Sequence, residues 1–317
     1  MRKPNVFIVG FAKCGTTTLA NLLSKHSSIN MPSKKELHYF ESKYEDFPLN
    51  GPGDRKSPEI QSLDDYLSFY KGASEPYLID ATPAYIVTDG VEKDLFEFNN
   101  EAKIIIMIRN PVQRCFSNYK HLVRDGKENL DFNNALKAEE ERQEKNWSQF
   151  WRYKDNSLYH DRIKKYYDLF GKKNVKVIIT EEFKESQEVV VDNIIDWLDL
   201  QREHIYSEAT YNKSGAPNAI LRTVNTLKKV RLLNRIGKSI ISKERFERFK
   251  NHNLQTIKMD EEVNQSLMQL FEDDIKQTER LINKDLSDWY RRLKFNNYEG
   301  CRYTLNYHNE RSSLRKS

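Results

Sequence analysis

The chain has 317 residues, a formal net charge of +5 at neutral pH and a mean hydropathy of −0.81. That length suits one large α/β domain with a sizeable core. No apolar run approaches the ~20 residues of a membrane-spanning helix, and the apolar stretch nearest the start is shorter than the roughly 7–15 residues of a signal sequence core. We therefore expect a cytoplasmic protein that does not insert into a membrane.

Charge and cysteine content narrow the class of ligand. The mild basic excess suits an anionic ligand. The chain lacks the arginine-rich arm or aromatic motif of a nucleic-acid-binding domain, so we expect no nucleic-acid partner. The three cysteines are isolated, which indicates neither a disulfide framework nor a zinc site, and we expect no metal.

The pattern of short apolar runs predicts a parallel sheet. Strands are expected at Val6–Gly10, Tyr77–Asp80, Lys103–Arg109 and Asn174–Thr180. Helical patterns are expected at Thr17–His26, Leu63–Tyr70, Val112–Arg124, Asn133–Lys145, Ser157–Phe170, Gln187–Leu198 and about Asp260 to Asn283. Buried strands that alternate with helices favour an α/β fold with helices on both faces of the sheet. Ligands bind such folds beyond the carboxyl ends of the strands.

A glycine loop resembling a P-loop follows the first strand. Gly10 and Gly15 have the G-x-x-x-x-G spacing, and a helix comes next. Free backbone N–H groups and the positive end of the helix dipole make such a turn an anion site. In NTPases a lysine follows the second glycine, whereas here a threonine follows it and Lys13 lies inside the loop. The loop predicts a phosphate-like ligand, but not ATP in the usual way, held by Lys13, Cys14, Gly15, Thr16, Thr17 and Thr18.

Cys14, inside this loop, has two interpretations. It could act as a nucleophile, but a small residue that fills a tight loop is the better interpretation.

A second anion-binding pair is expected at the same edge of the sheet. Arg109 ends a predicted strand, and Pro111 suits the first position of the next helix. That helix places Ser117 about two turns further on. The fork of an arginine and the hydroxyl of a serine can hold one phosphate together.

Two more segments complete the predicted site. The run from Lys34 to Phe40 places Glu36 beside two lysines, although a charged turn followed by an apolar strand also fits this pattern. The loop of Lys213, Ser214 and Gly215 would fold over a ligand or form a plain surface connection. An aromatic cluster of Trp147, Phe150, Trp151 and Tyr153 suits either stacking on sugar rings or packing in the core.

Together these motifs resemble those of the PAPS-dependent sulfotransferases, PAPS being 3′-phosphoadenosine-5′-phosphosulfate. Residues 7–17 resemble the 5′-phosphosulfate loop of that family, and residues 108–111 with 117–119 resemble its 3′-phosphate motif. Residues 35–40 are similar to the segment that carries the base in the heparan sulfate branch, and residues 80–85 resemble its TPxY stretch. Where that stretch often has a lysine, this chain has Ala81, so the corresponding substrate contact does not carry over. The similarity covers most of the chain to about residue 290.

The resemblance implies an α/β sulfotransferase fold and transfer of the sulfuryl group from PAPS, without a metal, leaving PAP. It assigns Lys13 to the oxygen that bridges phosphate and sulfate. Thr16 and Thr17 would hold the 5′ end, and Arg109 with Ser117 the 3′-phosphate. The loop from Lys213 to Gly215 resembles a family loop over the adenosine end.

The resemblance makes Glu36 the general base, with His38 and His121 as rivals because other branches use histidine. The acceptor would be a hydroxyl or amine, and the heparan branch favours a carbohydrate or glycan. A lipid or small natural product is the alternative acceptor, and a P-loop small-molecule kinase is the less favoured alternative activity. We expect a sulfotransferase domain at residues 1–295 and a polar tail at 296–317, and the sequence leaves the oligomeric state open.

Overall fold

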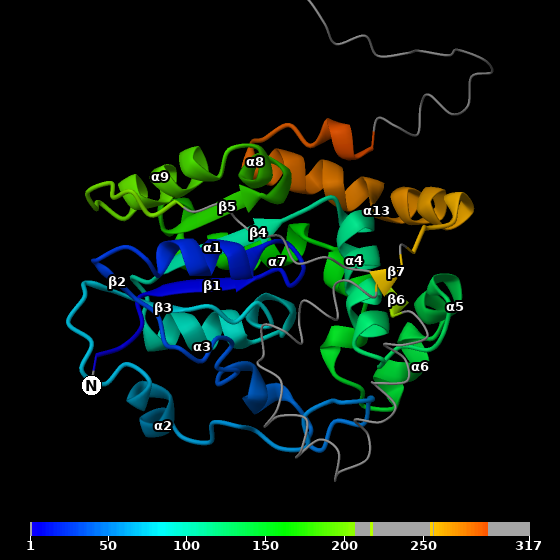
Figure 1. Cartoon of the computed structure of the whole chain (residues 1–317), viewed down its shortest axis with the longest axis horizontal. Helices are drawn as coiled ribbons and strands as arrows, with labels where there is room; N and C mark the ends of the chain where they lie inside the picture. Colours follow the sequence, from blue (N-terminus) through cyan, green and yellow to red (C-terminus); the bar gives the residue numbers. More distant parts are fainter. Residues whose placement is uncertain (1, 207–215, 218–253, 256, 291–317) are drawn as a thin grey trace, which may run out of the picture.

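The computed structural model describes residues 2–206, 216–217, 254–255 and 257–290, with a five-stranded parallel sheet at its centre (Figure 1). The strand order is β2-β3-β1-β4-β5. The strands are β1 (Val6–Gly10), β2 (Ile29–Asn30), β3 (Tyr77–Asp80), β4 (Lys103–Ile108) and β5 (Val175–Ile179). All of β1 is buried, as expected for a central strand that is covered on both faces.

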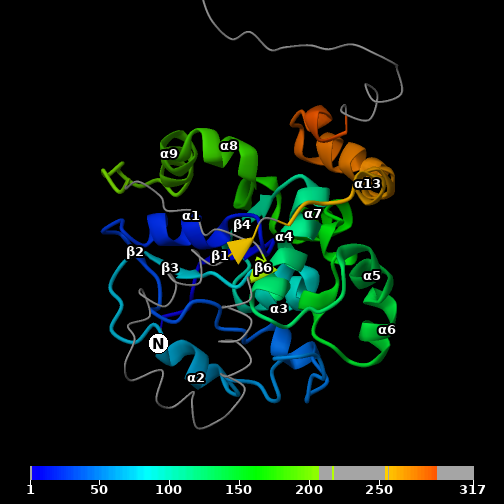
Figure 2. The ribbon, with the colours of Figure 1, turned by 45° about the vertical axis from the view of Figure 1, so that its right-hand side comes forward.

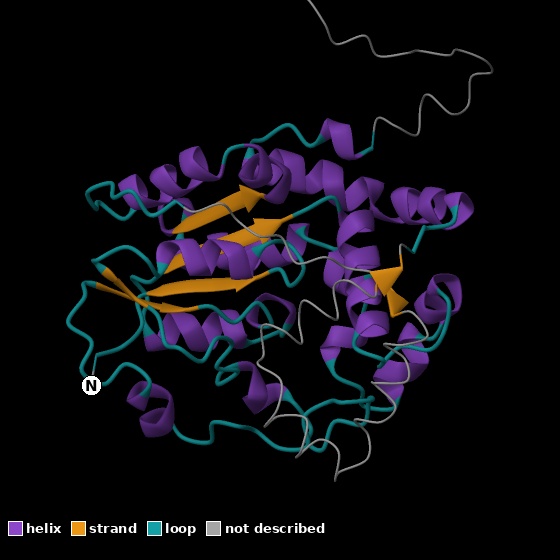
Figure 3. Cartoon of the chain, in the orientation of Figure 1, coloured by secondary structure: helices purple, strands orange, loops and turns teal. Residues whose placement is uncertain are grey.

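Helices cover both faces of this sheet (Figures 1 and 3). On one side α1 (Thr16–Leu23) packs against α9 (Gln187–Trp197), and on the other α3 (Val91–Phe98) packs against α7 (His160–Phe170). Figure 2 shows α1 and α9 above the strands and α3 below them. The predicted α/β class with a doubly covered parallel sheet is therefore confirmed.

The remaining elements extend this core. The other helices in the described ranges are α2 (Leu63–Ser68), α4 (Pro111–Arg124), α5 (Phe132–Lys137), α6 (Glu139–Glu144), α8 (Thr180–Glu185) and α13 (Glu261–Ile282). Short 3-10 turns are η1 (Glu41–Tyr44), η2 (Tyr85–Val87), η3 (Gln149–Trp151), η4 (Asp155–Ser157), η5 (Lys172–Asn174) and η6 (Ser287–Trp289). A small antiparallel pair, β6 (Ala216–Pro217) and β7 (Leu254–Gln255), lies beside α4. No helix in the described ranges has the length and apolar character needed to cross a bilayer.

The predicted strands agree with the structure to within one residue at each end, but several predicted helices differ. The sequence pattern missed β2, α3 and α8, which are short. The single helix predicted at Asn133–Lys145 is two helices that meet at Ala138. The second of them buries Glu139, whose carboxylate accepts hydrogen bonds from the backbone N–H groups of Lys154 and Asp155. Such a tertiary contact leaves no trace in hydrophobic periodicity.

The predicted tail at 296–317 and the predicted loop at Lys213–Gly215 lie outside the described residues.

Candidate active site

The glycine loop joins β1 to α1, and its backbone is shaped to bind an anion. Gly15 precedes the first residue of α1 with a φ of 94°, a left-handed conformation that glycine adopts without steric cost. No side chain caps the helix, and the Thr18 N–H donates to the Gly15 carbonyl at 3.0 Å. Among the described residues the N–H groups of Thr16 and Thr17 have no acceptor, so they are open to an external one. Thr16 is buried in the loop, whereas Thr17 is exposed at its surface. The loop has the architecture that its sequence predicted.

Lys13 lies in this loop with its side chain partly desolvated. Its backbone is also left-handed, with a φ of 74°. Burial lowers the pKa of Lys13 to about 8, and the positive charge of Arg124 acts in the same direction. The negative charges of Asp125 and Glu36 oppose that shift. Lys13 and Glu36, which the sequence assigned to one site, thus lie close enough to interact electrostatically.

Cys14 is fully buried beneath the loop. Burial raises the pKa of its thiol to about 11, so the thiolate is scarce at neutral pH. Its backbone carbonyl accepts a hydrogen bond of 2.6 Å from the Thr180 hydroxyl. These features support the interpretation of Cys14 as a residue that fills the loop.

Lys35 connects the Glu36 segment to the glycine loop. Its ammonium donates to Thr17 Oγ1 at 2.7 Å and to Glu36 Oε1 at 2.9 Å. The Glu36 side chain is 42% exposed, which leaves its carboxylate accessible to a ligand. A carboxylate is therefore held beside the anion-binding loop.

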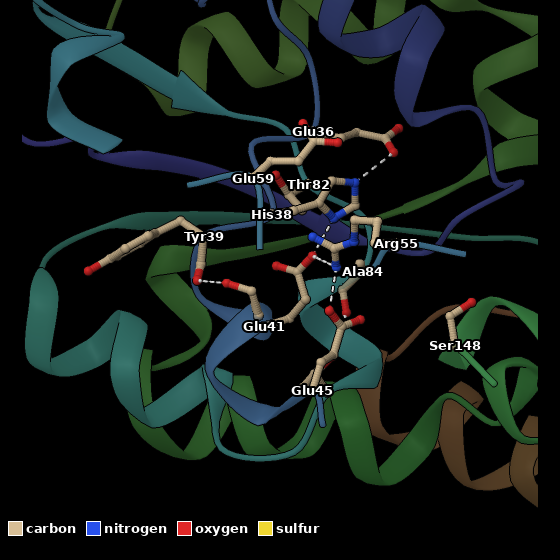
Figure 4. A network of polar contacts seen from close by, with 12 residues as sticks. Glu36, His38, Tyr39, Glu41, Glu45, Arg55, Glu59, Thr82, Ala84 and Ser148 are labelled. Atoms are coloured by element: carbon tan, nitrogen blue, oxygen red, sulfur yellow. Dashed lines mark hydrogen bonds and ion pairs between the residues drawn. The ribbon is translucent and has the colours of Figure 1, made fainter. Parts of the chain in front are cut away.

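His38 lies next to Glu36 and belongs to a chain of charged groups (Figure 4). Its Nε2 is 3.7 Å from Glu36 Oε2, and its Nδ1 is hydrogen-bonded to the wholly buried Glu41. Burial opposes protonation of His38, but the hydrogen bond and negative charge of Glu41 outweigh it and raise the pKa of His38. Arg55 closes the network, with its Nη2 at 3.3 Å from Glu41 Oε1 and 2.6 Å from Glu45 Oε2.

Sequence reasoning missed Glu41 and Arg55. Glu41 comes three residues after His38, and that spacing was the only available signal. Arg55 lies in the segment between η1 and α2, and no local pattern connects it to residue 41.

A buried polar cluster fixes the backbone between Glu36 and His38. Both of these residues are left-handed, with φ values of 62° and 56°, and the N–H group of Leu37 between them donates to Thr82 Oγ1 at 3.0 Å. The Thr82 hydroxyl donates in turn to Asp80 Oδ1 at 2.6 Å. Left-handed backbone at non-glycine residues persists only where the surroundings hold it, and this cluster does so.

Asp80 anchors that cluster at the end of β3. The hydroxyls of Tyr66 and Tyr85 each donate to its Oδ2 at 2.8 Å. Burial raises the pKa of Asp80, although its three hydrogen bonds from hydroxyl groups act in the opposite direction. The TPxY stretch therefore holds the backbone of the Glu36 segment in place through hydrogen bonds.

His121 lies on α4 in a basic environment. Burial, followed by the positive charge of Lys13, lowers the pKa of His121 to about 3. Its Nδ1 is 2.9 Å from Arg124 Nη2. The ring is neutral at physiological pH, and a histidine with such a low pKa is a weak proton acceptor. His121 remains a candidate by position, but its environment does not favour a role as base.

Arg109 follows β4 and retains unused hydrogen-bonding capacity. Its Nη2 donates to Gln113 Oε1 at 3.0 Å, and its backbone carbonyl accepts from the Tyr159 hydroxyl at 2.8 Å. Its Nε is buried and has no hydrogen-bond partner within the part of the chain that the structure describes. A buried donor of this kind needs a partner, and a phosphate oxygen would supply one.

Ser117, the predicted partner of Arg109, lies on α4. That helix begins at Pro111 as predicted, and the Asn110 side chain caps it by accepting a hydrogen bond of 3.1 Å from the N–H group of Gln113. Ser117 is half-buried. The pair therefore remains a prediction with suitable secondary structure.

A cavity of about 310 Å³ opens beside Glu36 and His38. Its wall begins at Ala12 in the glycine loop and continues along the segments around Arg55, Ala84 and Phe150. A small molecule in this cavity would lie against the carboxylate of Glu36 and next to the loop of Lys13. Over the described ranges, no three acidic, histidine or cysteine side chains are grouped as a metal site would require.

Comparison with known proteins identifies a family. A family model described as the sulfotransferase family matches residues 4–204. The crystal structure of a sulfotransferase from Alicyclobacillus acidocaldarius is 31% identical, with a TM-score of 0.72, and the match covers 92% of this chain and all of that one.

Two curated relatives match a smaller region. The membrane-associated sulfotransferase kil1 of Dictyostelium discoideum is 36% identical over 37% of this chain and 22% of its own length. The mouse heparan sulfate glucosamine 3-O-sulfotransferase 5 is 26% identical over 39% of this chain and 32% of its own length. The matched region thus spans less than a third of each of these two proteins. The family match over residues 4–204, together with the fold, shows that this chain belongs to the sulfotransferase family.

Proposed function

We propose that this sulfotransferase moves the sulfuryl group from PAPS to a hydroxyl or amine of an acceptor and releases PAP. The observation that carries the proposal is the juxtaposition of Lys13, in an uncapped glycine loop, with the carboxylate of Glu36. PAPS supplies an activated sulfuryl group, so the chain itself needs to bind both substrates, stabilise the leaving phosphate and remove one proton.

Lys13 would stabilise the leaving group. When the bond between sulfur and the bridging oxygen breaks, negative charge develops on the phosphate. An ammonium group in a partly desolvated loop meets that charge with little screening by water, and a single well-placed donor of this kind is commonly worth about 3–4 kcal/mol of transition-state stabilisation. The N–H groups of the first turn of α1 would hold the 5′-phosphate beside it.

Glu36 would take the proton of the acceptor as the new bond between oxygen and sulfur forms. Its carboxylate is exposed to the cavity, and Lys35 and His38 orient it. A positioned general base contributes about 10²–10⁴-fold to the rate. The pKa of about 3 makes His121 a weaker candidate than Glu36 for the same step.

Arg109 and Ser117 would recognise the 3′-phosphate. The unpartnered Nε of Arg109 fits this role, since a bound phosphate would complete its hydrogen bonding. ATP has no phosphate at the 3′ position, so this pair would discriminate against a kinase substrate.

Thermal denaturation with nucleotides tests the donor. PAP at 100 times its dissociation constant would stabilise the protein by about 2.7 kcal/mol, and ATP with magnesium would stabilise it far less. A protein that ATP stabilises as strongly as PAP does would favour the kinase alternative.

Turnover of labelled PAPS tests the catalytic roles. Lys13→Ala and Glu36→Gln are expected to lose transfer activity, and Glu36→Gln is expected to keep its affinity for PAP. If Glu36→Gln retains full activity, the base lies elsewhere, and variants of His38 and His121 become the next to measure.

A further inference from the structure

The cavity beside Glu36 has an apolar flank. Leu49, Val87, Leu122 and Phe150 line it, and they come from four separate segments of the chain. Phe150 is half-buried, whereas its neighbours Trp151 and Tyr153 are wholly buried in the core. Of the aromatic cluster noted in the sequence, Phe150 is thus the member that faces the cavity in the described structure. A ligand in this cavity would place an apolar surface against these side chains.

The charged groups of the cavity do not favour an anionic ligand. Its described lining holds four carboxylates, from Glu36, Glu45, Asp54 and Glu59, and three permanent cations, from Arg55, Arg114 and Lys127. The imidazole of His38 also lines it and is paired with the buried Glu41. Carboxylates thus outnumber the permanent cations along the wall. In addition, any anionic group on the acceptor would approach the carboxylate that the proposed chemistry requires to be ionised.

Two of the three cations are already engaged by the protein. Arg55 is paired with Glu41 and Glu45. Arg114 is buried, and its guanidinium donates to the Ser157 hydroxyl at 2.8 Å and to the backbone carbonyls of Ala12 and Tyr153 at 3.3 and 3.2 Å. Arg55 Nη1 is buried and has no hydrogen-bond partner among the described residues, but both carboxylates bind Nη2. All three nitrogens of Arg114 donate to the protein. Neither guanidinium can therefore present its Nη1–Nη2 edge to a sulfate or carboxylate for a bidentate contact.

The third cation is weakly held by the protein. Lys127 Nζ donates to the carbonyl of Gly53 at 3.3 Å. A lone ammonium of this kind does not make a binding site for a polyanion. Ala81, at a position where the heparan branch often has lysine, adds no charge and is buried.

From this lining we infer that the acceptor is an uncharged alcohol with an apolar flank, not a sulfated or carboxylated glycan. Its hydroxyl would lie at Glu36, and its apolar side would contact Val87, Leu122 and Phe150. The cavity volume of about 310 Å³ lies at the lower end of the range for small-molecule sites. This inference rests on the proposed function, because it treats the cavity as the acceptor site of that reaction.

A matched pair of ligands tests the inference by calorimetry on the full chain loaded with PAP. Phenyl β-D-glucoside and phenyl β-D-glucuronide differ only in a neutral hydroxymethyl group against a carboxylate. We expect the glucoside to bind at least tenfold more tightly. Equal binding, preference for the glucuronide, or binding of neither ligand would overturn the inference. If PAP itself fails to bind, the proposed function falls and the inference falls with it, so the two failures are distinguishable.

A variant of the apolar wall locates the binding site. Val87→Lys adds a cation to the cavity and is expected to reduce or reverse the preference for the glucoside. Val87→Met, of similar length and without charge, is the matched control and is expected to retain it. Both variants should bind PAP as the natural protein does, since Val87 lines the cavity and does not belong to the glycine loop. An unchanged preference in Val87→Lys would show that these ligands bind outside the cavity, which contradicts the inference.

Discussion

The lowered pKa of Lys13 predicts an unusual pH dependence of donor capture. In the free protein this lysine has a pKa of about 8 instead of 10.5. Because Lys13 loses its charge as the pH rises through that value, about nine tenths of the molecules carry the ammonium at pH 7 and about one tenth at pH 9. We therefore expect kcat/KM for PAPS to fall about tenfold between pH 7 and pH 9. A lysine with the ordinary pKa would remain almost fully charged over this range.

Steady-state rates at a series of pH values measure this effect. The profile of kcat/KM reports ionisations of the free enzyme, whereas that of kcat reports those of the complex with its substrates. The anionic donor favours the charged lysine, so the basic limb of kcat should lie at higher pH than that of kcat/KM. Lys13→Arg is the matched control, because an arginine stays protonated over this range.

Two results would refute this reasoning. One is a profile of kcat/KM that stays flat to pH 10 in the natural protein. The other is a limb near pH 8 that persists unchanged in Lys13→Arg, which would assign the titration to another group.

The structure makes three further predictions. Thr82→Val leaves the buried N–H of Leu37 without its acceptor, so it should lower the unfolding free energy by about 1–3 kcal/mol and also lower kcat. Thr82→Ser keeps the hydroxyl and should preserve both properties. Urea denaturation and turnover measure the two effects, and equal behaviour of the two variants would contradict this prediction. Gly15→Ala forces a side chain into a φ of 94° and should cost about 1–2 kcal/mol of stability and weaken PAP binding, as calorimetry would show. The pKa of His38 is raised in the folded state, so its pairing with Glu41 stabilises the protein fully below the unfolded pKa of about 6.5 and less as the pH rises through the folded pKa. The difference in unfolding free energy between the natural protein and His38→Gln should therefore shrink from pH 6 to pH 9. A difference that grows over this range would refute the pairing.

Local sequence determined four of the five strands of the central sheet and the shape of the glycine loop. The buried strands read directly as apolar runs, and the pair Gly10 and Gly15 with Lys13 between them indicated an anion site without the usual P-loop lysine. Pro111 marked the start of α4 correctly, since proline at a helix start is a local preference. These features depend on neighbours a few residues apart, which is why the pattern of the sequence was enough to predict them.

Only the tertiary structure decided the electrostatics and the cavity beside Glu36. Glu41 and Arg55 meet through a fold that brings separate segments together, and the pKa of His121 depends on Lys13, far from it in sequence. Burial and charge pairing are properties of three-dimensional neighbourhoods, so composition and spacing could not show that two of the cations lining the cavity, Arg55 and Arg114, are paired within the protein. The same physical reason explains why the resemblance to glycan sulfotransferases does not specify the acceptor. The motifs that carry the resemblance are short and local, whereas the wall of the proposed acceptor cavity is built from distant loops.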